Sequence, residues 1–142
     1  MSHPSIYPCL WFDGQAREAA GFYCEVFPNS AILETNPPVV TFELNGKKFM
    51  ALDGGPMFKL SEAVSFVIEC HTQDEIDYYW DKLTAGGGEE SYCGWLKDKF
   101  GVSWQVLPAI LPELMSNPEK APKVAEAFLK MRKFDINTLL NV

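Results

Sequence analysis

The sequence predicts an α+β fold built from two similar halves and a helical tail. Three observations predict it. Short apolar strands alternate with two amphipathic helix patterns, the order strand, helix, strands occurs twice with an offset of roughly 55 to 60 residues, and helix signals prevail in the last part of the chain. A chain of 142 residues is long enough to bury a core without disulfides or metals. We therefore expect residues 1–142 to form one domain, with modules over 6–55 and 63–108 and a helical tail over 109–142.

The first half begins with an apolar run, Ile6 to Phe12, that is typical of a strand. Apolar residues at helical spacing follow between Gln15 and Phe27, and Asp13 stands where it could cap that helix. Ala31 to Glu34 is a short strand candidate. Two further apolar runs flank Asn45-Gly46, which is the strongest hairpin signal in the chain.

The second half repeats this order, beginning with the apolar strand Ala63 to Cys70. Thr72 and Glu75 match a capping box, in which a hydroxyl and a carboxylate satisfy backbone N–H groups at a helix start. Apolar residues then recur at helical spacing, so Gln73 to Ala85 is predicted to be an amphipathic helix. The run Gly86-Gly87-Gly88 ends it.

The stretch Ser91 to Pro108 reads as two apolar strands joined by the charged turn Lys97 to Gly101. It brings together aromatic, thiol and amide side chains within a short segment: Cys93, Trp95, Trp104 and Gln105. Such a set is expected in the wall of a small-molecule pocket.

The tail carries its own helix signals. Asn117-Pro118 can start a helix, and Asp135 can cap a last turn. Since no further sheet face remains in the repeat, the tail is expected to pack across the outside of the sheets or onto a second subunit.

The charge balance excludes several classes of partner. Twelve Lys and Arg against nineteen Asp and Glu give a net charge of −7, which repels nucleic acids and anionic membranes. No apolar run approaches the roughly 20 residues that span a bilayer. The first residues lack a basic segment and an apolar stretch of the signal-peptide type, so a cytoplasmic location is expected.

The four cysteines are widely spaced and are predicted to be free thiols. Cys9, Cys24 and Cys70 lie in apolar strand or helix patterns, which favours small core residues. Cys93 lies beside the predicted pocket, and its thiol is either structural or a reactive group.

Several segments, in order, resemble the vicinal oxygen chelate superfamily of glyoxalases, bleomycin-resistance proteins and extradiol dioxygenases. They are PCLWFDGQAREAAGFYCEVFPNS, FELNGKKFMALDGGPMFK, AVSFVIEC with QDEIDYYWDKL, and CGWLKDKFGVSWQVLP. Within it, the chain resembles the PhnB-like branch, often labelled 3-demethylubiquinone-9 3-methyltransferase. The resemblance implies two βαβββ modules whose strands form a curved mixed sheet around a ligand, commonly in a homodimer.

The same resemblance implies where a metal would be held, namely at four inward positions in the first and last strand of each module. In this chain they correspond to about Pro8, Ala51 with Asp53 close by, Ser65 and Gln105. Pro8 and Ala51 have no side-chain donor, whereas a catalytic divalent site needs about three protein ligands. No metal and no other cofactor is therefore expected.

The residues predicted to bind a ligand come from both halves: Pro8, Leu10, Ser65, Trp95, Trp104 and Gln105. Trp95 and Trp104 either stack on a planar ligand or pack in the core. Gln105 could orient a ligand by hydrogen bonding, and Asp53 is either a turn residue or an acid/base at the cavity mouth. Gln105, Asp53 and Cys93 are the weak catalytic candidates. Glu69 and Asp98 are interpreted as solvated edge charges.

Three hypotheses follow. The first is a metal-independent protein that binds a small apolar or aromatic molecule. The second is an enzyme of the isomerase, lyase or transferase type, although neither Asp53-Gly54-Gly55-Pro56 nor Gly86 to Gly88 has the strand–turn–helix context of a methyl-donor site. The third is a structural dimer that binds another protein.

Overall fold

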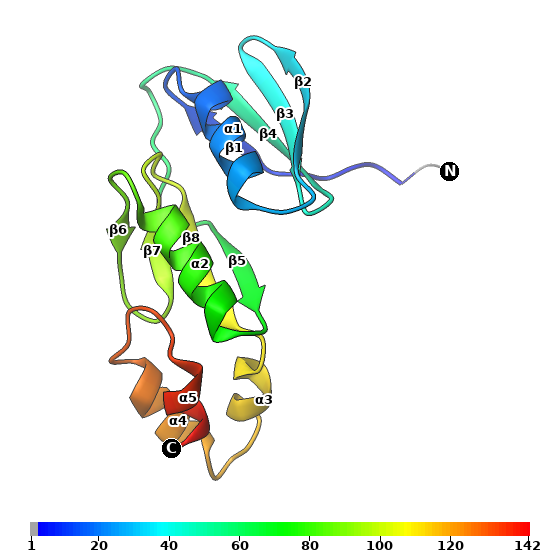
Figure 1. The fold of residues 1–142 in the computed structure, drawn as a ribbon. Coiled ribbons are helices and arrows are strands. Elements are labelled where there is room, and N and C mark those ends of the chain that lie inside the picture. The colour runs from blue at the N-terminus through cyan, green and yellow to red at the C-terminus, as the bar shows by residue number, and fades with distance from the viewer. Residues whose placement is uncertain (1–2) are drawn as a thin grey trace. The chain divides into compact units, whose positions relative to one another are not determined.

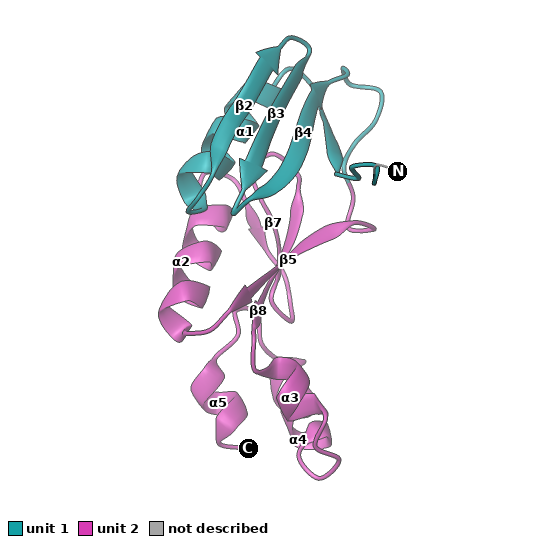
Figure 2. Ribbon diagram, turned by 90° about the vertical axis from the view of Figure 1, so that its right-hand side faces the viewer, with its two compact units in different colours: residues 1–60 teal, residues 61–142 magenta. Residues whose placement is uncertain are grey.

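The computed structural model describes residues 3–142, and the chain divides into two compact units, residues 1–60 and 61–142 (Figure 2). The first unit contains β1 (Cys9–Phe12), α1 (Ala16–Val26), β2 (Ala31–Asn36), β3 (Val39–Leu44) and β4 (Lys47–Asp53). The second repeats this order with β5 (Ser65–Cys70), α2 (Gln73–Thr84), β6 (Glu89–Glu90), β7 (Trp95–Lys97) and β8 (Ser103–Pro108). The α+β class and the predicted duplication are confirmed.

Each unit folds into a four-stranded mixed sheet with one helix against it (Figure 1). The strand orders are β1-β4-β3-β2 and β5-β8-β7-β6. In both, the first strand lies parallel to the last, and the remaining pairs are antiparallel. The long connection that a parallel pair requires passes through α1 or α2 and the intervening strands.

The core of the first unit lies between α1 and one face of its sheet. Ala16, Ala19 and Ala20 are fully buried and let the helix approach the strands closely. The ring of Tyr23 stacks on Phe42 with centroids 6.3 Å apart, and Phe42 stacks on Phe49 at 5.4 Å. Side chains along a strand alternate between the two faces of a sheet. The sequence neighbours of Phe42 in β3 and of Phe49 in β4 therefore lie on the opposite, open face, which α1 does not cover.

The helix caps partly follow the prediction. In α2, the Thr72 hydroxyl accepts from the Glu75 N–H, and the capping box is confirmed. In α1, the prediction that Asp13 caps the helix is wrong, because Asp53 at the end of β4 accepts the Ala16 N–H at 2.8 Å instead. The first helix is therefore capped by a residue distant in sequence.

The predicted hairpins are present in both units. Asn45 and Gly46 have φ angles of 50° and 80°, as the tight turn between β3 and β4 requires. In the second unit, the turn after β7 is closed by the Gly101 N–H, which donates to the Asp98 carbonyl at 2.9 Å. The two-residue strand β6 completes the second βαβββ module that the resemblance implies, although Glu89 and Glu90 carry no apolar pattern that would locate it.

The tail consists of α3 (Leu111–Met115), α4 (Ala121–Phe128) and α5 (Ile136–Leu140), belongs to the second unit, and contacts the start of α2 and the Cys93-Gly94 segment. Its packing onto a second subunit stays a prediction. The Gln73 amide donates to the Phe134 carbonyl and accepts the Ile136 N–H, each at 2.9 Å. Phe134 packs against Gly94, where a Cβ atom would lie 2.7 Å from its ring. The predicted Asp135 cap of α5 is confirmed by its bond to the Thr138 N–H.

The cysteines are free thiols, as predicted, but they differ in burial. Cys70 is buried, Cys24 is partly buried, and Cys9 is exposed. The prediction of a core position for Cys9 is wrong, because Leu10 and Phe12 turn inward and leave Cys9 on the open face. No helix in the described part of the chain has the length and apolar character needed to span a bilayer.

Candidate functional site

The candidate site lies on the open face of the second sheet, the face turned away from α2. Gln105 is paired with Val67 on one side and with Trp95 on the other. The Gln105 Nε2 donates to the Ser65 Oγ at 2.9 Å. Three of the predicted ligand-binding residues, Ser65, Trp95 and Gln105, are thus brought together on one face.

The other predicted tryptophan lies on the opposite face. Trp104 is only 3% exposed, and its ring lies 5.5 Å from that of Phe66. Its Nε1 donates to the Asp98 Oδ2 at 2.8 Å. This geometry corresponds to the core alternative for Trp104, so a ligand on the open face would not reach its ring.

The same contact corrects the interpretation of Asp98 as a solvated charge. Asp98 is 3% exposed, and its Oδ1 also accepts from the N–H groups of Phe100 and Val102. Several hydrogen bonds compensate for burying this carboxylate. Asp98 therefore fastens the turn between β7 and β8 to the core.

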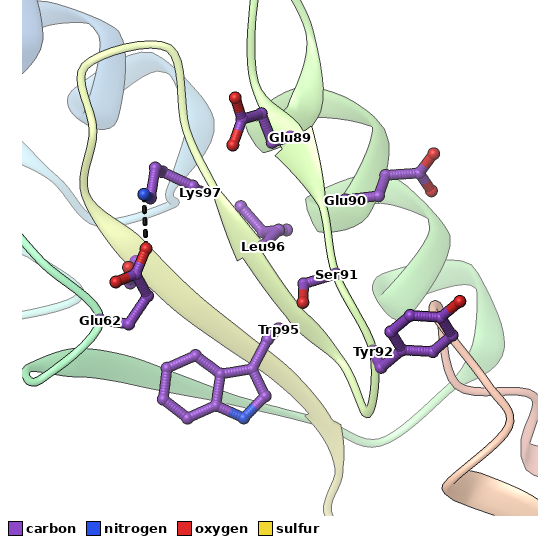
Figure 3. A pocket seen from close by; sticks show the side chains of 9 residues that line it. Glu62, Glu89, Glu90, Ser91, Tyr92, Trp95, Leu96 and Lys97 are labelled. Atoms are coloured by element: carbon purple, nitrogen blue, oxygen red, sulfur yellow. Dashed lines mark ion pairs between the residues drawn. The ribbon is translucent and has the colours of Figure 1, made fainter.

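A hollow of about 400 Å³ opens on this part of the second unit (Figure 3). Its walls come from β6, β7, the segment that joins them, the start of β8 and the segment before β5. The lining residues are Glu62, Glu89, Glu90, Ser91, Tyr92, Trp95, Leu96, Lys97 and Ser103. Of the predicted site residues, only Trp95 lines the hollow directly. Gln105 is paired with Trp95 in the neighbouring strand β8.

Charged groups gather along one row of the sheet. Lys97 forms an ion pair with Glu62, and Glu89 is its partner residue in β6 (Figure 3). The hydrogen-bonded Lys97 ammonium lowers the pKa of Glu62. The bond to Glu62, assisted by the charge of Glu89, raises the pKa of Lys97. Both shifts favour the charged forms of Glu62 and Lys97.

Ser103 is the polar residue at the base of this row. It is paired with Lys97 on one side and Ser65 on the other, and it is 2% exposed. Its Oγ is buried without a hydrogen-bond partner among the described residues. A buried hydroxyl normally has a partner, so this group is able to accept or donate a bond to a ligand.

The sequence analysis missed most of these polar residues, although two of them carried a signal. Ser103 and Lys97 each lie two positions from a predicted site residue, Gln105 or Trp95, and strand alternation places them on the same face. Glu62 and Glu89 belonged to no predicted element, so nothing local indicated them.

In the first unit, the predicted residues divide between the faces of the sheet. Leu10 is 6% exposed and lies on the α1 side, next to the fully buried Ala51 in the register of β1 and β4. Its neighbours Cys9 and Trp11 occupy the open face instead. Pro8 precedes β1 and is partly buried, and its carbonyl accepts the Met50 N–H.

The three weak catalytic candidates occupy different settings. The Asp53 carboxylate caps α1, and Gln105 is bonded to Ser65. Cys93 is partly buried, has a φ angle of 59°, and donates its N–H to the Met131 carbonyl. It is not among the residues that line the hollow.

The four positions that the resemblance relates to metal binding do not present a suitable donor set. Pro8 and Ala51 lack side-chain donor atoms, and the Gln105 amide and the Ser65 hydroxyl are bonded to each other. Among the residues that the structure describes, no three His, Cys, Asp or Glu side chains form a group that could hold a metal ion. A divalent cation needs more ligands than these positions offer.

A family profile described as 3-demethylubiquinone-9 3-methyltransferase matches residues 4–107. Among solved structures, the PhnB protein from Bacillus cereus is 33% identical, with a TM-score of 0.65 over 75% of this chain and 100% of that chain. No match is found among proteins with curated functions.

More distant structures have the same fold. The fosfomycin resistance protein FosX from Listeria monocytogenes, complexed with Mn(II) and sulfate ion, is 13% identical, with a TM-score of 0.61 over 82% of this chain and 98% of that chain. A glyoxalase-related enzyme from Fulvimarina pelagi is 15% identical, with a TM-score of 0.55 over 74% and 87%. These two likenesses concern the fold alone.

Proposed function

This chain belongs to the PhnB-like family described as 3-demethylubiquinone-9 3-methyltransferase, within the glyoxalase superfamily, and from this membership we propose that it binds a small apolar or aromatic molecule without a metal. The ligand would occupy the open face of the second sheet. The observation that supports this most is the hollow of about 400 Å³ with Trp95 in its wall. Pockets for small molecules are commonly about 300–1,000 Å³.

Trp95 supplies the apolar surface of the proposed site. Its indole is half-buried in β7, so one side is held by the sheet and the other is open to a ligand. Val67 lies on the same face, paired with Gln105 on the side opposite to Trp95, and is 52% exposed. A planar apolar ligand would cover both side chains, and burial of apolar area favours binding.

Two polar groups on this face would orient the ligand. Because its Nε2 is bonded to Ser65, the Gln105 amide is held in one orientation across β5 and β8. The Ser103 hydroxyl offers a second hydrogen bond from within the hollow. Fixed polar groups that orient a ligand are typical of small-molecule sites.

We also propose that ligand binding requires no metal ion. This proposal is supported by the donor chemistry at Pro8, Ala51, Ser65 and Gln105. No other cofactor is proposed.

The alternative is an enzyme of the superfamily, an isomerase, lyase or transferase, acting on an unidentified substrate. The family description, which names a methyltransferase, favours it. Its candidate residues would be Gln105, Asp53 and Cys93. The capping role of Asp53 weakens this alternative, because the carboxylate oxygen nearest to α1 is already bonded.

The protein is further proposed to act as a homodimer, as the family resemblance implies, and in the cytoplasm, the location expected from the sequence. The molar mass in solution, measured by light scattering, tests the first part. Neither part is needed for the binding proposal.

A heteronuclear NMR titration tests the binding proposal. We would add naphthylethanol to the protein in buffer containing EDTA, with ethanol as the matched control for the hydroxyl group. The expected result is a set of saturable amide shifts confined to residues 91–97 and 103–107. Shifts that are absent, or that appear only when a divalent metal is supplied, would overturn the proposal.

A further inference from the structure

Carboxylates outnumber ammonium groups in the wall of the hollow. Glu62 and Glu89 both lie beside the single ammonium of Lys97. The third carboxylate of the wall, Glu90, accepts the Trp80 Nε1 at 2.6 Å and is bound toward α2. One cation between two carboxylates leaves the row with one negative charge, which attracts a cation and repels an anion.

The aromatic groups of the wall point to the same kind of ligand. Trp95 lies two residues from Lys97 on the same face of β7. Indole is the side chain whose ring attracts cations most strongly. Tyr92 already has the Arg132 guanidinium at 5.1 Å from its ring centroid, so Trp95 is the ring that remains for a ligand.

Ser103 provides an observation that does not depend on the charges. Its hydroxyl lines the hollow, is almost fully buried, and has no partner among the described residues. It lies in the same cross-strand row as Lys97 and Glu89. A hydroxyl oxygen at this place can accept a hydrogen bond from an ammonium N–H group.

We propose that the ligand of this hollow is an aromatic molecule that carries an ammonium group. The ring stacks on Trp95, the positive charge lies beside Glu89 and Glu62, and the ammonium donates to the Ser103 hydroxyl. This inference rests on the proposed binding function and adds the class of ligand to it.

Three probes of similar size test the proposal by isothermal titration calorimetry at neutral pH. They are naphthylethylammonium, naphthylethanol and naphthylacetate, which share the ring and differ in charge. The cation is expected to bind about tenfold tighter than the alcohol, and the carboxylate weaker than both. The advantage of the cation should shrink as the salt concentration is raised, since part of the site is open to water.

Two variants test whether Glu89 and Ser103 cause the preference for the cation over the alcohol. Glu89→Gln is expected to remove most of the advantage of the cation over the alcohol, whereas Glu126→Gln, an exposed change in α4 of equal charge, should leave it unchanged. Ser103→Ala should weaken the cation about fivefold without lowering stability, because no hydrogen bond within the unit is lost.

The outcomes separate this inference from the proposed function. If the alcohol binds as tightly as the cation, or the carboxylate binds best, the ammonium proposal is overturned and the binding function stands. If none of the three probes binds, both are overturned. An equal effect of Glu89→Gln and Glu126→Gln would also contradict the proposal, because the preference would then come from the net charge of the protein.

Discussion

The Nε2 of Gln105 lies 2.9 Å from the Oγ of Ser65 and donates a hydrogen bond to it. The bond joins β8 to β5, its parallel neighbour, on the open face of the second sheet. The resemblance relates both positions to metal ligands in the superfamily, but in this chain the two side chains are hydrogen-bonded to each other. The face therefore presents an oriented amide beside Trp95.

Ser65→Ala is expected to release this amide. Affinity for naphthylethanol should fall about threefold, because the Gln105 amide loses its fixed orientation and a single hydrogen bond contributes roughly 0.5–1.5 kcal/mol. Calorimetric titration of the variant measures the change. Ser116→Ala, which removes an exposed serine hydroxyl from the tail of the same unit, is the matched control and should bind like the parent protein. Equal affinity of Ser65→Ala and the parent would show that the orientation of Gln105 is irrelevant to binding.

The capping role of Asp53 predicts a loss of stability. Asp53→Ala should lower the free energy of unfolding by about 1 kcal/mol, since the Ala16 N–H would lose its acceptor. Asp13→Ala, at the position that the sequence suggested for the cap, should change it by less than about 0.5 kcal/mol. Urea denaturation compares the two variants. The reverse order would show that Asp13 is the cap in solution.

The burial of Asp98 predicts a larger effect. Asp98→Ala removes the acceptor of the Trp104 Nε1 and of two backbone N–H groups, so we expect a loss of about 2–3 kcal/mol in the free energy of unfolding. Glu69→Ala, at an exposed position of β5, should have little effect. The pair is measured by urea denaturation, and similar values for both would mean that Asp98 is solvated after all.

The docking of the tail predicts that Gly94 cannot be replaced. In Gly94→Ala the new Cβ would lie 2.6 Å from the Val106 carbonyl oxygen and 2.7 Å from the Phe134 ring. Gly101→Ala has a similar positive φ but open space around it, so it isolates the backbone strain. We expect Gly94→Ala to cost at least about 1 kcal/mol more than Gly101→Ala. Equal costs would indicate that neither the Val106 carbonyl nor the Phe134 ring lies against Gly94.

Burial of Cys70 predicts both its reactivity and a pH dependence. Burial, with a smaller contribution from Glu75, raises the pKa of the Cys70 thiol from 9.0 to about 12. The folded protein thus holds this proton more tightly than the unfolded chain. Its contribution to stability is complete below pH 9.0 and is lost as the pH rises from 9.0 toward about 12.

Thiol labelling checks the prediction. At neutral pH, a disulfide reagent should modify the exposed Cys9 in the native protein and Cys70 only after unfolding. Fully unfolded protein, in which every cysteine should react, is the control. Modification of native Cys70 at the rate of Cys9 would contradict its burial.

Features determined by neighbouring residues were predictable from the sequence. The Thr72 and Glu75 capping box and the Asn45-Gly46 turn depend on a few adjacent side chains, and both are present as expected. The repeat of elements also followed from local patterns. In contrast, the cap of α1 comes from Asp53, which reaches Ala16 only after β4 has paired with β1.

The site was less predictable, for physical reasons that differ between residues. β1 is apolar at every position, so alternation alone could not decide whether Leu10 or Cys9 turns inward. Asp98 was interpreted as a solvated charge of the turn, because Trp104 looks like an apolar residue in the sequence. The single polar atom of its indole, Nε1, is the one that donates to Asp98. The hollow depends on the pairing of β6 with β7, and the two-residue strand β6 has no sequence signal.

The most direct test of metal-free binding at Trp95 is a calorimetric titration of naphthylethanol into the parent protein and Trp95→Ala, both with EDTA and with circular dichroism to verify folding. We predict that the parent protein binds the probe in EDTA and that Trp95→Ala binds it about tenfold more weakly, as the loss of a stacking ring implies. Binding that disappears in EDTA, or that is equal in the folded variant, would contradict the account.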